Sequence, residues 1–250
     1  MPCVDANIDV LVERGVPFGD GKLLDIYRPA NLGGRPGPTV LLWHGVGTDE
    51  RDVVAPLACT VAGAYGLTVV ASDWRSDAPD GGHAHLQASL TYVRAAAALL
   101  GGLGEDSIVL AGWSRGGRNA AAAAVRPDAV GGWRPMAVVC LGAAFLRTAP
   151  LTHGSPIEDL AVCDAPPVPF WLVHGTRDTV VPVTASREWA ELLTAKGWPV
   201  RLETPETDHA GVIGAQYDTA AGRPVRGTAA HAVAAGELSA AMIAKAARLA

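Results

Sequence analysis

The sequence predicts an α/β domain in which a mostly parallel sheet is covered by helices on both faces. Short apolar runs alternate along the chain with longer Ala-rich runs, as they do in a sheet built from strand–helix units. The apolar runs are almost uninterrupted by polar residues, which is typical of strands buried on both faces. With 250 residues, 49% of them apolar and 18% charged, we expect residues 1–250 to form a single domain with a sizeable core.

The predicted elements begin with a hairpin and continue as alternating strands and helices. The hairpin has strands at residues 8–13 and 23–27, joined by a glycine-containing turn at residues 18–21. Further strands are predicted at residues 39–43, 67–71, 108–111, 136–141, 170–173 and 200–202. Helices are predicted at residues 54–65, 86–100, 118–125, 185–196 and 229–249.

Two stretches show neither the apolar pattern of a strand nor that of a helix. Residues 145–169 carry prolines at 150, 156, 166, 167 and 169, which preclude one long helix. This stretch is too short for a lid domain, so we expect a short irregular cap-like segment that forms one wall of a pocket. Residues 211–227 separate His209 from the last helix, and nothing in their composition determines their shape.

A serine between two glycines follows the apolar run that ends at Ala111, in Gly112-Trp113-Ser114-Arg115-Gly116. This spacing is typical of a nucleophile elbow, a sharp turn from a strand into a helix. We expect Ser114 to adopt a strained backbone conformation, and its flanking positions must be small so that strand and helix can pass closely. The turn lifts the hydroxyl clear of the sheet, which makes Ser114 the candidate nucleophile.

Two residues farther along the chain can activate this serine. A serine hydroxyl needs a histidine to take its proton and a carboxylate to orient that histidine. Asp178 follows the strand at residues 170–173, and His209 follows the last short strand. Loops at the carboxyl ends of parallel strands share one crevice, so we predict His209 as the general base and Asp178 as the acid. Asp159 and Asp164, after the preceding strand, are the alternative acids.

A developing oxyanion requires backbone N–H groups that are already in position. The strand at residues 39–43 ends in Trp43-His44-Gly45-Val46-Gly47, and we assign this role to the N–H groups of Val46 and Arg115. The Arg115 N–H lies near the positive end of the helix dipole. Gly45 and Gly47 would let the backbone approach the substrate without an intervening side chain.

The substrate pocket is harder to predict. Trp74, Arg75 and Trp113 lie at the expected catalytic edge and are candidate pocket residues, although packing beneath the elbow is the favoured role of Trp113. Arg75, Arg115 and Arg177 near this edge suggest recognition of a substrate carboxylate. Acidic neighbours in the sequence favour local ion pairing for Arg75 instead.

The histidines and cysteines give no sign of a metal or cofactor site. His44 and His174 both precede a glycine at a strand end, and we expect them to be structural residues held by loop hydrogen bonds. The other histidines have no metal-type spacing. The four cysteines, at 3, 59, 140 and 163, are not closely paired in the sequence, so buried free thiols are favoured over disulfides.

The motifs together resemble those of the α/β-hydrolase superfamily along nearly the whole chain. The His-Gly loop at residues 44–47, the elbow, the His-Gly-x-x-Asp-x-x-Val-Pro stretch around Asp178 and the terminal Asp-His pair occur in the same order. Leu24-Asp25-Ile26-Tyr27-Arg28-Pro29 and the elbow look like those of small carboxylesterases, acetyl-ester hydrolases and prolyl-oligopeptidase-type catalytic domains. The resemblance implies an eight-stranded, mostly parallel sheet and a Ser-Asp-His hydrolase without a large lid or a propeller domain.

The net charge and the lengths of the apolar runs exclude some classes of binding partner. The net charge of −5 and the isoelectric point near 5.8 argue against a nucleic-acid surface, and no apolar run reaches the length of a membrane helix. The start of the chain has no signal-like pattern, so we expect a cytoplasmic protein, monomeric or homodimeric, whose partner is a small acyl compound.

The predicted function is therefore a serine esterase that needs no cofactor. The same triad can also cleave lactones, thioesters, amides or carbon–carbon bonds, or catalyse acyl transfer or cyclisation. The sequence does not distinguish these reactions from ester hydrolysis. A binding or scaffold protein that keeps the fold without turnover is the alternative from another class.

Overall fold

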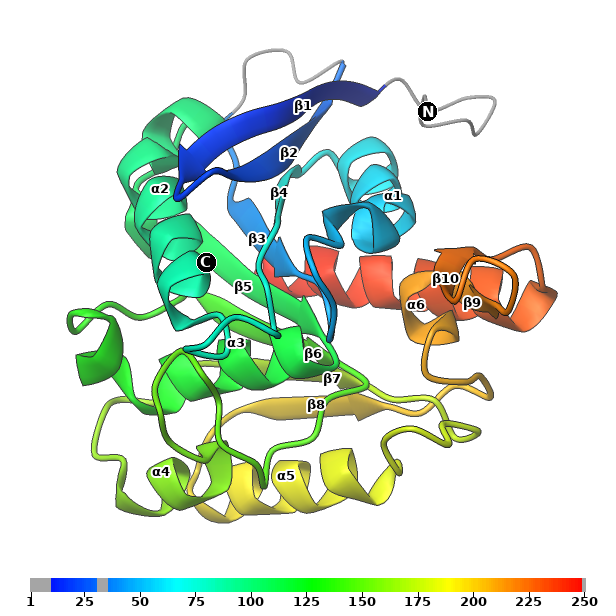
Figure 1. Cartoon of the computed structure of the whole chain (residues 1–250). Helices are drawn as coiled ribbons and strands as arrows, with labels where there is room; N and C mark the ends of the chain where they lie inside the picture. The colour runs from blue at the N-terminus through cyan, green and yellow to red at the C-terminus, as the bar shows by residue number, and fades with distance from the viewer. Residues whose placement is uncertain (1–9, 31–35, 249–250) are drawn as a thin grey trace.

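The computed structural model describes residues 10–30 and 36–248, and its centre is one eight-stranded sheet (Figure 1). The strands are β1 (Val10–Gly19), β2 (Lys22–Pro29), β3 (Thr39–Trp43), β4 (Thr68–Ser72), β5 (Ile108–Trp113), β6 (Ala137–Leu141), β7 (Phe170–Val173) and β8 (Val200–Glu203). They lie in the order β1-β2-β4-β3-β5-β6-β7-β8. β1 and β2 pair antiparallel with each other, β2 is also antiparallel to β4, and the strands from β4 to β8 pair in parallel. The predicted eight-stranded, mostly parallel sheet is thus confirmed.

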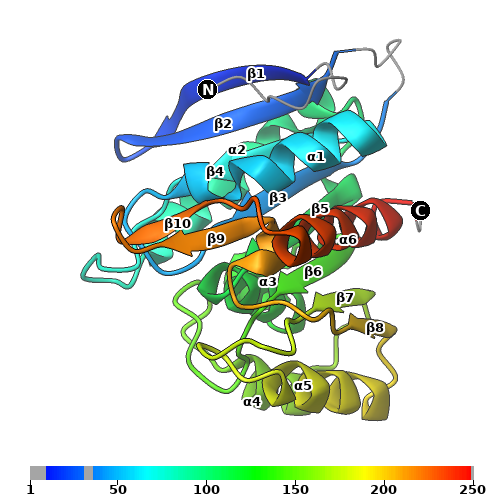
Figure 2. The same cartoon turned by 90° about the vertical axis from the view of Figure 1, so that its right-hand side faces the viewer.

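Helices cover both faces of this sheet (Figures 1 and 2). α1 (Ala55–Tyr65) and α6 (Ala230–Ala246) pack side by side on one face. The other face carries α2 (His83–Leu100), α3 (Arg115–Val125), α4 (Pro156–Val162) and α5 (Thr184–Ala195). The connections also contain short 3₁₀ helices, which are η1 (Arg51–Val54), η2 (Glu105–Ser107), η3 (Pro127–Val130) and η4 (Gly211–Ile213).

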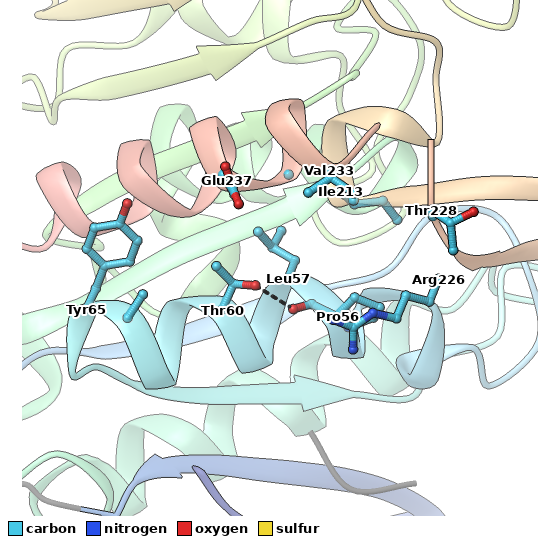
Figure 3. A pocket seen from close by; sticks show the side chains of 13 residues that line it. Pro56, Leu57, Thr60, Tyr65, Ile213, Arg226, Thr228, Val233 and Glu237 are labelled. Atoms are coloured by element: carbon cyan, nitrogen blue, oxygen red, sulfur yellow. Dashed lines mark hydrogen bonds between the residues drawn. The ribbon is translucent and has the colours of Figure 1, made fainter. Parts of the chain in front are cut away.

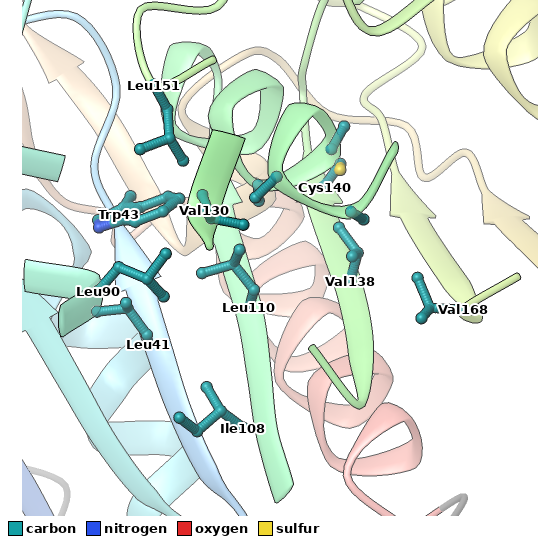
Figure 4. Packing of buried hydrophobic residues seen from close by; sticks show 14 of the residues in the cluster. Leu41, Trp43, Leu90, Ile108, Leu110, Val130, Val138, Cys140, Leu151 and Val168 are labelled. Atoms are coloured by element: carbon teal, nitrogen blue, oxygen red, sulfur yellow. The ribbon is translucent and has the colours of Figure 1, made fainter. Parts of the chain in front are cut away.

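The core is divided by the sheet into two apolar clusters, because successive strand residues point to opposite faces. In β3, Leu41 and Trp43 lie in the cluster beneath α2 and α3 (Figure 4), whereas Val40 and Leu42 lie in the cluster beneath α1 and α6. Both faces are buried, which explains why these strands contain almost no polar residues. The indole N–H of Trp43 donates to Ser89 Oγ at 3.0 Å and so satisfies its polar atom inside the core.

The predicted elements are present, with shifted ends. β5 continues to Trp113 and α3 begins at Arg115, because the turn between strand and helix takes up Ser114 alone. The first residues of the predicted hairpin, the last residue of the predicted final helix and Cys3 lie outside the described residues.

The proline-rich segment is a packed part of the fold. It contains α4, whose Pro156 stands in the first turn, where no intrahelical N–H is needed. Ahead of that helix, Phe145 stacks on Trp189 of α5 at 4.9 Å between ring centroids. The segment thus packs on α3 and α5. The prolines prevent one long helix, but the segment is not irregular throughout, because it contains α4.

Residues 211–227 form a structure that composition did not reveal. β9 (Ala215–Asp218) and β10 (Arg223–Arg226) make a separate two-stranded antiparallel hairpin. Asp218 Oδ1 accepts from the N–H groups of Ala220 and Ala221 at 2.8 and 3.1 Å, a side-chain turn that such residues favour. Gly222, with φ of +66°, then lets the chain return.

The cysteine prediction was wrong at one position. Cys59 is disulfide-bonded, whereas Cys140 and Cys163 are free and buried. Burial raises the pKa of the Cys140 thiol, so this thiol is unreactive at neutral pH. A disulfide is more typical of oxidising compartments, and the expected cytoplasmic location stays a prediction. No helix within residues 10–30 and 36–248 is long and apolar enough to cross a membrane.

A buried ion cluster joins the hairpin to the parallel part of the sheet. Arg51 in η1 binds Asp25 of β2 through Nε at 2.9 Å and also binds Asp73, which follows β4. Asp25, 2% exposed, accepts in addition from Arg14 and from the Gly15 N–H, each at 2.9 Å. Arg51 therefore bridges two carboxylates that are withdrawn from water, and Arg14 adds a second positive charge at Asp25.

Replacing Arg51 by methionine is expected to lower the free energy of unfolding by about 3 kcal/mol, because an uncompensated buried charge costs about 3–5 kcal/mol. Denaturant unfolding measures this change. The control is Arg28→Met: its partner Glu13 has a side chain 59% exposed, and loss of such a surface pair costs less than about 1 kcal/mol. Equal losses in the two variants would contradict the role of Arg51.

Candidate active site

Ser114 has the strained backbone conformation expected of the elbow. Its φ and ψ are 54° and −118°, a region that costs a non-glycine residue about 1–3 kcal/mol. The Ser114 N–H donates to the Leu141 carbonyl of β6 at 2.7 Å, which ties the strained residue to the neighbouring strand. The hydroxyl is thereby held at the carboxyl end of β5.

The glycines of the elbow allow three backbone segments to meet. A Cβ at Gly112 would lie 2.3 Å from the carbonyl carbon of Gly116, and a Cβ at Gly116 would lie 2.4 Å from the His44 carbonyl oxygen. These distances are far below any van der Waals contact, and the atoms approached are backbone. Only glycine therefore permits β5, α3 and the loop after β3 to pack this closely.

The predicted base and acid are in direct contact. His209 Nδ1 lies 2.6 Å from Asp178 Oδ2, although the two residues are 31 positions apart. Asp178 Oδ1 accepts from the N–H groups of Val180 and Val181, both at 2.8 Å. Asp178 therefore occupies the position predicted for the acid. Of the alternatives, Asp159 pairs with Arg126 at 3.5 Å, and Asp164 is exposed.

Asp178 remains ionised in this environment. Burial alone raises the pKa of its carboxyl, but hydrogen bonds from His174, His209 and the Val181 N–H outweigh burial and hold the pKa well below its usual range. The buried His174 contributes through Nε2, which lies 3.3 Å from Asp178 Oδ2 and 2.9 Å from the Val181 carbonyl oxygen. Because both neighbours are acceptors, Nε2 carries the proton, and Nδ1 accepts from Ser186 Oγ at 2.7 Å. His174 thus has the structural role predicted from the sequence.

Ser114 and His209 face the same cavity of about 520 Å³. The Trp113 ring lies beside the His209 ring, 5.1 Å between centroids, and the Trp113 indole N–H donates to the His209 carbonyl at 2.9 Å. Within the described residues the Ser114 hydroxyl makes no hydrogen bond. Such contacts are often long in a free enzyme and shorten when substrate binds.

His44 fixes the loop that carries the predicted oxyanion site. Its Nε2 accepts from the backbone N–H groups of Glu50 and Trp74 at 3.2 and 3.3 Å, so Nδ1 carries the proton and donates to the Gly45 carbonyl at 3.0 Å. Complete burial lowers the pKa of His44 to about 4. A neutral imidazole therefore holds both ends of the loop.

The loop after β3 lies against the nucleophile elbow. A Cβ at Gly45 would lie 2.9 Å from the Trp113 ring and 3.2 Å from Ser114 Cβ, so the loop rests directly on the elbow. The N–H groups of Val46 and Arg115 have no acceptor among the described residues. The Gly47 N–H, in contrast, donates to Ser76 Oγ at 3.0 Å. Gly45 and Gly47 thus shape the loop, and neither lines the cavity.

Two of the predicted pocket residues are elsewhere. Trp74 is fully buried, stacks on His44 at 5.3 Å and donates its indole N–H to the His44 carbonyl at 3.2 Å, so it supports the loop and cannot touch a substrate. Arg75 pairs with Asp77 at 2.8 Å outside the cavity. Trp113 does line the cavity, although only 5% of it is exposed.

The arginines also fail to form a carboxylate site. Arg177 lies 3.9 Å from Glu206, and the Arg115 guanidinium donates to the Ser76 carbonyl at 3.3 Å. Neither residue lines the cavity. The hypothesis of an anionic substrate therefore has no support in the geometry.

The cavity wall comes from a different part of the chain than the sequence suggested. Residues 145–169 contribute none of the lining. The lining residues that sequence reasoning missed are Glu50, Thr179, Val180, Asp208, Ala210, Tyr217, Gly222, Arg223 and Pro224. Four of them belong to the β9–β10 hairpin, which follows His209 in the chain and so returns to the site. Tyr217 and Arg223 in residues 211–227, directly after His209, were the sequence features that could have indicated this wall.

A second cavity, of about 620 Å³, lies between α1 and α6 (Figure 3). Its walls include Leu57, Val233 and Glu237, with Arg226 at one end. No serine, cysteine or histidine is among the lining residues, and the Thr60 hydroxyl donates to the Pro56 carbonyl at 3.1 Å. The candidate active site is thus the cavity at Ser114. In the described parts of the chain, no cluster of His, Cys, Asp or Glu residues could hold a metal ion.

The sheet order and the elbow define an α/β-hydrolase fold, and comparison with solved structures agrees. The chain is similar to a bacterial heroin esterase (TM-score 0.67, 20% identity, 97% of this chain and 86% of that chain). It is also similar to a native esterase of Thermogutta terrifontis (0.68, 20%, 94% and 90%) and to a thermostable esterase of Pseudomonas putida (0.70, 18%, 99% and 86%). No protein-family model matches the chain, and no curated protein matches it in sequence. At these identities the likeness establishes the fold.

Gly116→Ala is expected to lower the free energy of unfolding by about 3 kcal/mol or more, because its Cβ would meet the His44 carbonyl and separate α3 from the loop. Gly104→Ala is the control, since a Cβ there meets nothing within 4 Å and φ is −75°. Thermal and denaturant unfolding compare the two. Similar stability of both variants would show that the close approach is not required.

His44→Gln is expected to remove part of the acid sensitivity of the fold. The unfolded chain takes up a proton at His44 below about pH 6.5 and the folded chain only below about 4, so acidification through this range favours unfolding by up to about 3 kcal/mol. Glutamine keeps an acceptor for the two N–H groups but does not titrate. The free energy of unfolding of each protein, measured from pH 7 to 4, tests this, and parallel curves would contradict it.

Proposed function

We propose that this protein is a serine hydrolase that cleaves a small carboxylic ester through an acyl-enzyme intermediate. The observation that carries the proposal is the 2.6 Å contact between His209 and Asp178 at a cavity that also contains Ser114 in its strained conformation. Structural neighbours named as esterases support the same class of reaction. The fold holds Ser114, His209 and Asp178 in place, and these three side chains are the proposed nucleophile, base and acid.

In the first half of the reaction, Ser114 Oγ attacks the ester carbonyl carbon while His209 Nε2 takes the hydroxyl proton. The negative charge that develops on the carbonyl oxygen is stabilised by the N–H groups of Val46 and Arg115. His209 then gives its proton to the leaving alcohol, and the acyl group stays on Ser114.

In the second half, His209 takes a proton from water, whose oxygen attacks the acyl carbon. The bond to Ser114 Oγ then breaks, His209 returns the proton to that oxygen, and the acid is released. Asp178 holds His209 with Nδ1 protonated and stabilises the imidazolium formed in each half. Its pKa, lowered far below neutrality by hydrogen bonds despite burial, keeps it charged at the pH where the histidine must accept a proton.

The proposed partner is a small acyl compound, because the cavity of about 520 Å³ has the size of an ordinary ligand pocket. The mechanism needs no cofactor. Lactones, thioesters and amides would use the same residues, and a panel of acyl donors separates these reactions from ester cleavage.

Ser114→Ala is expected to fold as the wild type does and to lose about 10⁴-fold or more in turnover of p-nitrophenyl acetate. A fluorophosphonate probe should add to wild-type protein, with loss of fluoride, and not to the variant; intact-mass measurement reads this directly. Ser107→Ala is the control, since Ser107 belongs to η2, away from the cavity. Retained turnover in Ser114→Ala would refute the mechanism, and an unlabelled wild type would favour a binding protein.

A further inference from the structure

Glu50 is a carboxylate at the proposed active site that the mechanism does not use. Its backbone N–H donates to His44 Nε2 at 3.2 Å, so its position is set by the same imidazole that fixes the oxyanion loop. Its side chain lies over that loop, since a Cβ at Gly47 would be 2.3 Å from Glu50 Oε2. The residue lines the cavity together with Ser114 and Val46.

The Glu50 carboxylate has no hydrogen-bond or ion-pair partner among the described residues. Burial, aided by the charge of Asp52, raises its pKa above the ordinary value, while Arg223 acts in the opposite direction. A partly buried carboxylate without a partner loses hydration without compensation. A cation that entered the cavity would restore that lost interaction.

Arg223, the cationic side chain among the described lining residues, offsets the charge of Glu50 only in part. Arg223 lines the cavity, but its guanidinium is bound to Asp52 at 2.6 Å. Asp208 adds a further carboxylate, whose Oδ1 accepts from the Gly211 N–H at 2.8 Å. Among the described lining residues, two carboxylates thus stand against one guanidinium, which itself pairs with Asp52 outside the lining, so the net charge of the lining is negative.

The mouth of the cavity is apolar. Val46, Val180 and Tyr217 line the cavity and are 59%, 69% and 61% exposed, and apolar side chains grouped at a cavity mark a contact surface for a ligand. A tyrosine ring is also a group that binds cations through its face. The lining thus combines an apolar rim with an unpaired negative charge.

We propose that the cavity selects esters that carry an ammonium group on an apolar body, and that Glu50 is the specificity-determining residue that binds the ammonium. This inference rests on the proposed hydrolase function. Glu50 lies on the oxyanion side of the cavity, so the cation and the ester carbonyl are bound by the same short loop. The selected substrates are therefore small amino or quaternary-ammonium esters.

The test compares acetylcholine with 3,3-dimethylbutyl acetate, an ester of the same shape that has carbon in place of the charged nitrogen. We expect wild-type kcat/KM, measured in a pH-stat at low salt, to favour acetylcholine by about tenfold. In Glu50→Gln this preference should fall to within about twofold. Glu191→Gln, which removes the same charge from the exposed face of α5, should keep the full preference.

A wild type without preference, or a Glu50→Gln variant with an unchanged ratio, overturns the proposal. A general structural defect would slow both esters together and leave the ratio unchanged. If the wild type cleaves neither ester, the proposed ester hydrolysis fails. The role of Glu50 in binding an ammonium group is then tested separately, by a binding measurement. NMR titration of Ser114→Ala with choline and with 3,3-dimethylbutan-1-ol should then show a choline preference that Glu50→Gln abolishes; equal affinities would overturn it.

Discussion

The site depends on the close approach of three backbone segments at the elbow. Gly112 and Gly116 let α3 turn back onto β5 and let the loop after β3 rest on both. A single Cβ at Gly116 would push that loop away by its contact with the His44 carbonyl. At this close approach Ser114 has its positive φ, and Val46 lines the same cavity as Ser114.

Two buried histidines extend this constraint to the rest of the site. His44 uses one nitrogen as acceptor and one as donor to hold the predicted oxyanion loop. His174 also has partners at both nitrogens, Ser186 Oγ at Nδ1 and Asp178 at Nε2, and so helps to orient Asp178. His44 is neutral in this pattern, since burial lowers its pKa to about 4 and both its nitrogens have partners of the matching type. The histidine proposed to change protonation, His209, is the one that faces the cavity.

The proposed catalytic residues and part of the cavity wall come from different parts of the fold. The residues of the proposed triad and the proposed oxyanion loop lie at the carboxyl ends of β3, β5, β7 and β8, where the parallel sheet brings these ends together. Part of the cavity wall is supplied by the β9–β10 hairpin, which pairs with no strand of the main sheet.

The sequence by itself determined the sheet, the elbow and the candidate triad, because apolar strands, a Gly-x-Ser-x-Gly turn and strand-end polar residues are local signals. Tertiary structure alone decided which strand-end residues face the cavity. Trp74 turned inward to support His44, Arg75 paired outside, and Cys59 formed a disulfide. Glu50 and the hairpin entered the site through contacts between segments distant in the chain, and such contacts leave no periodicity or motif to be read.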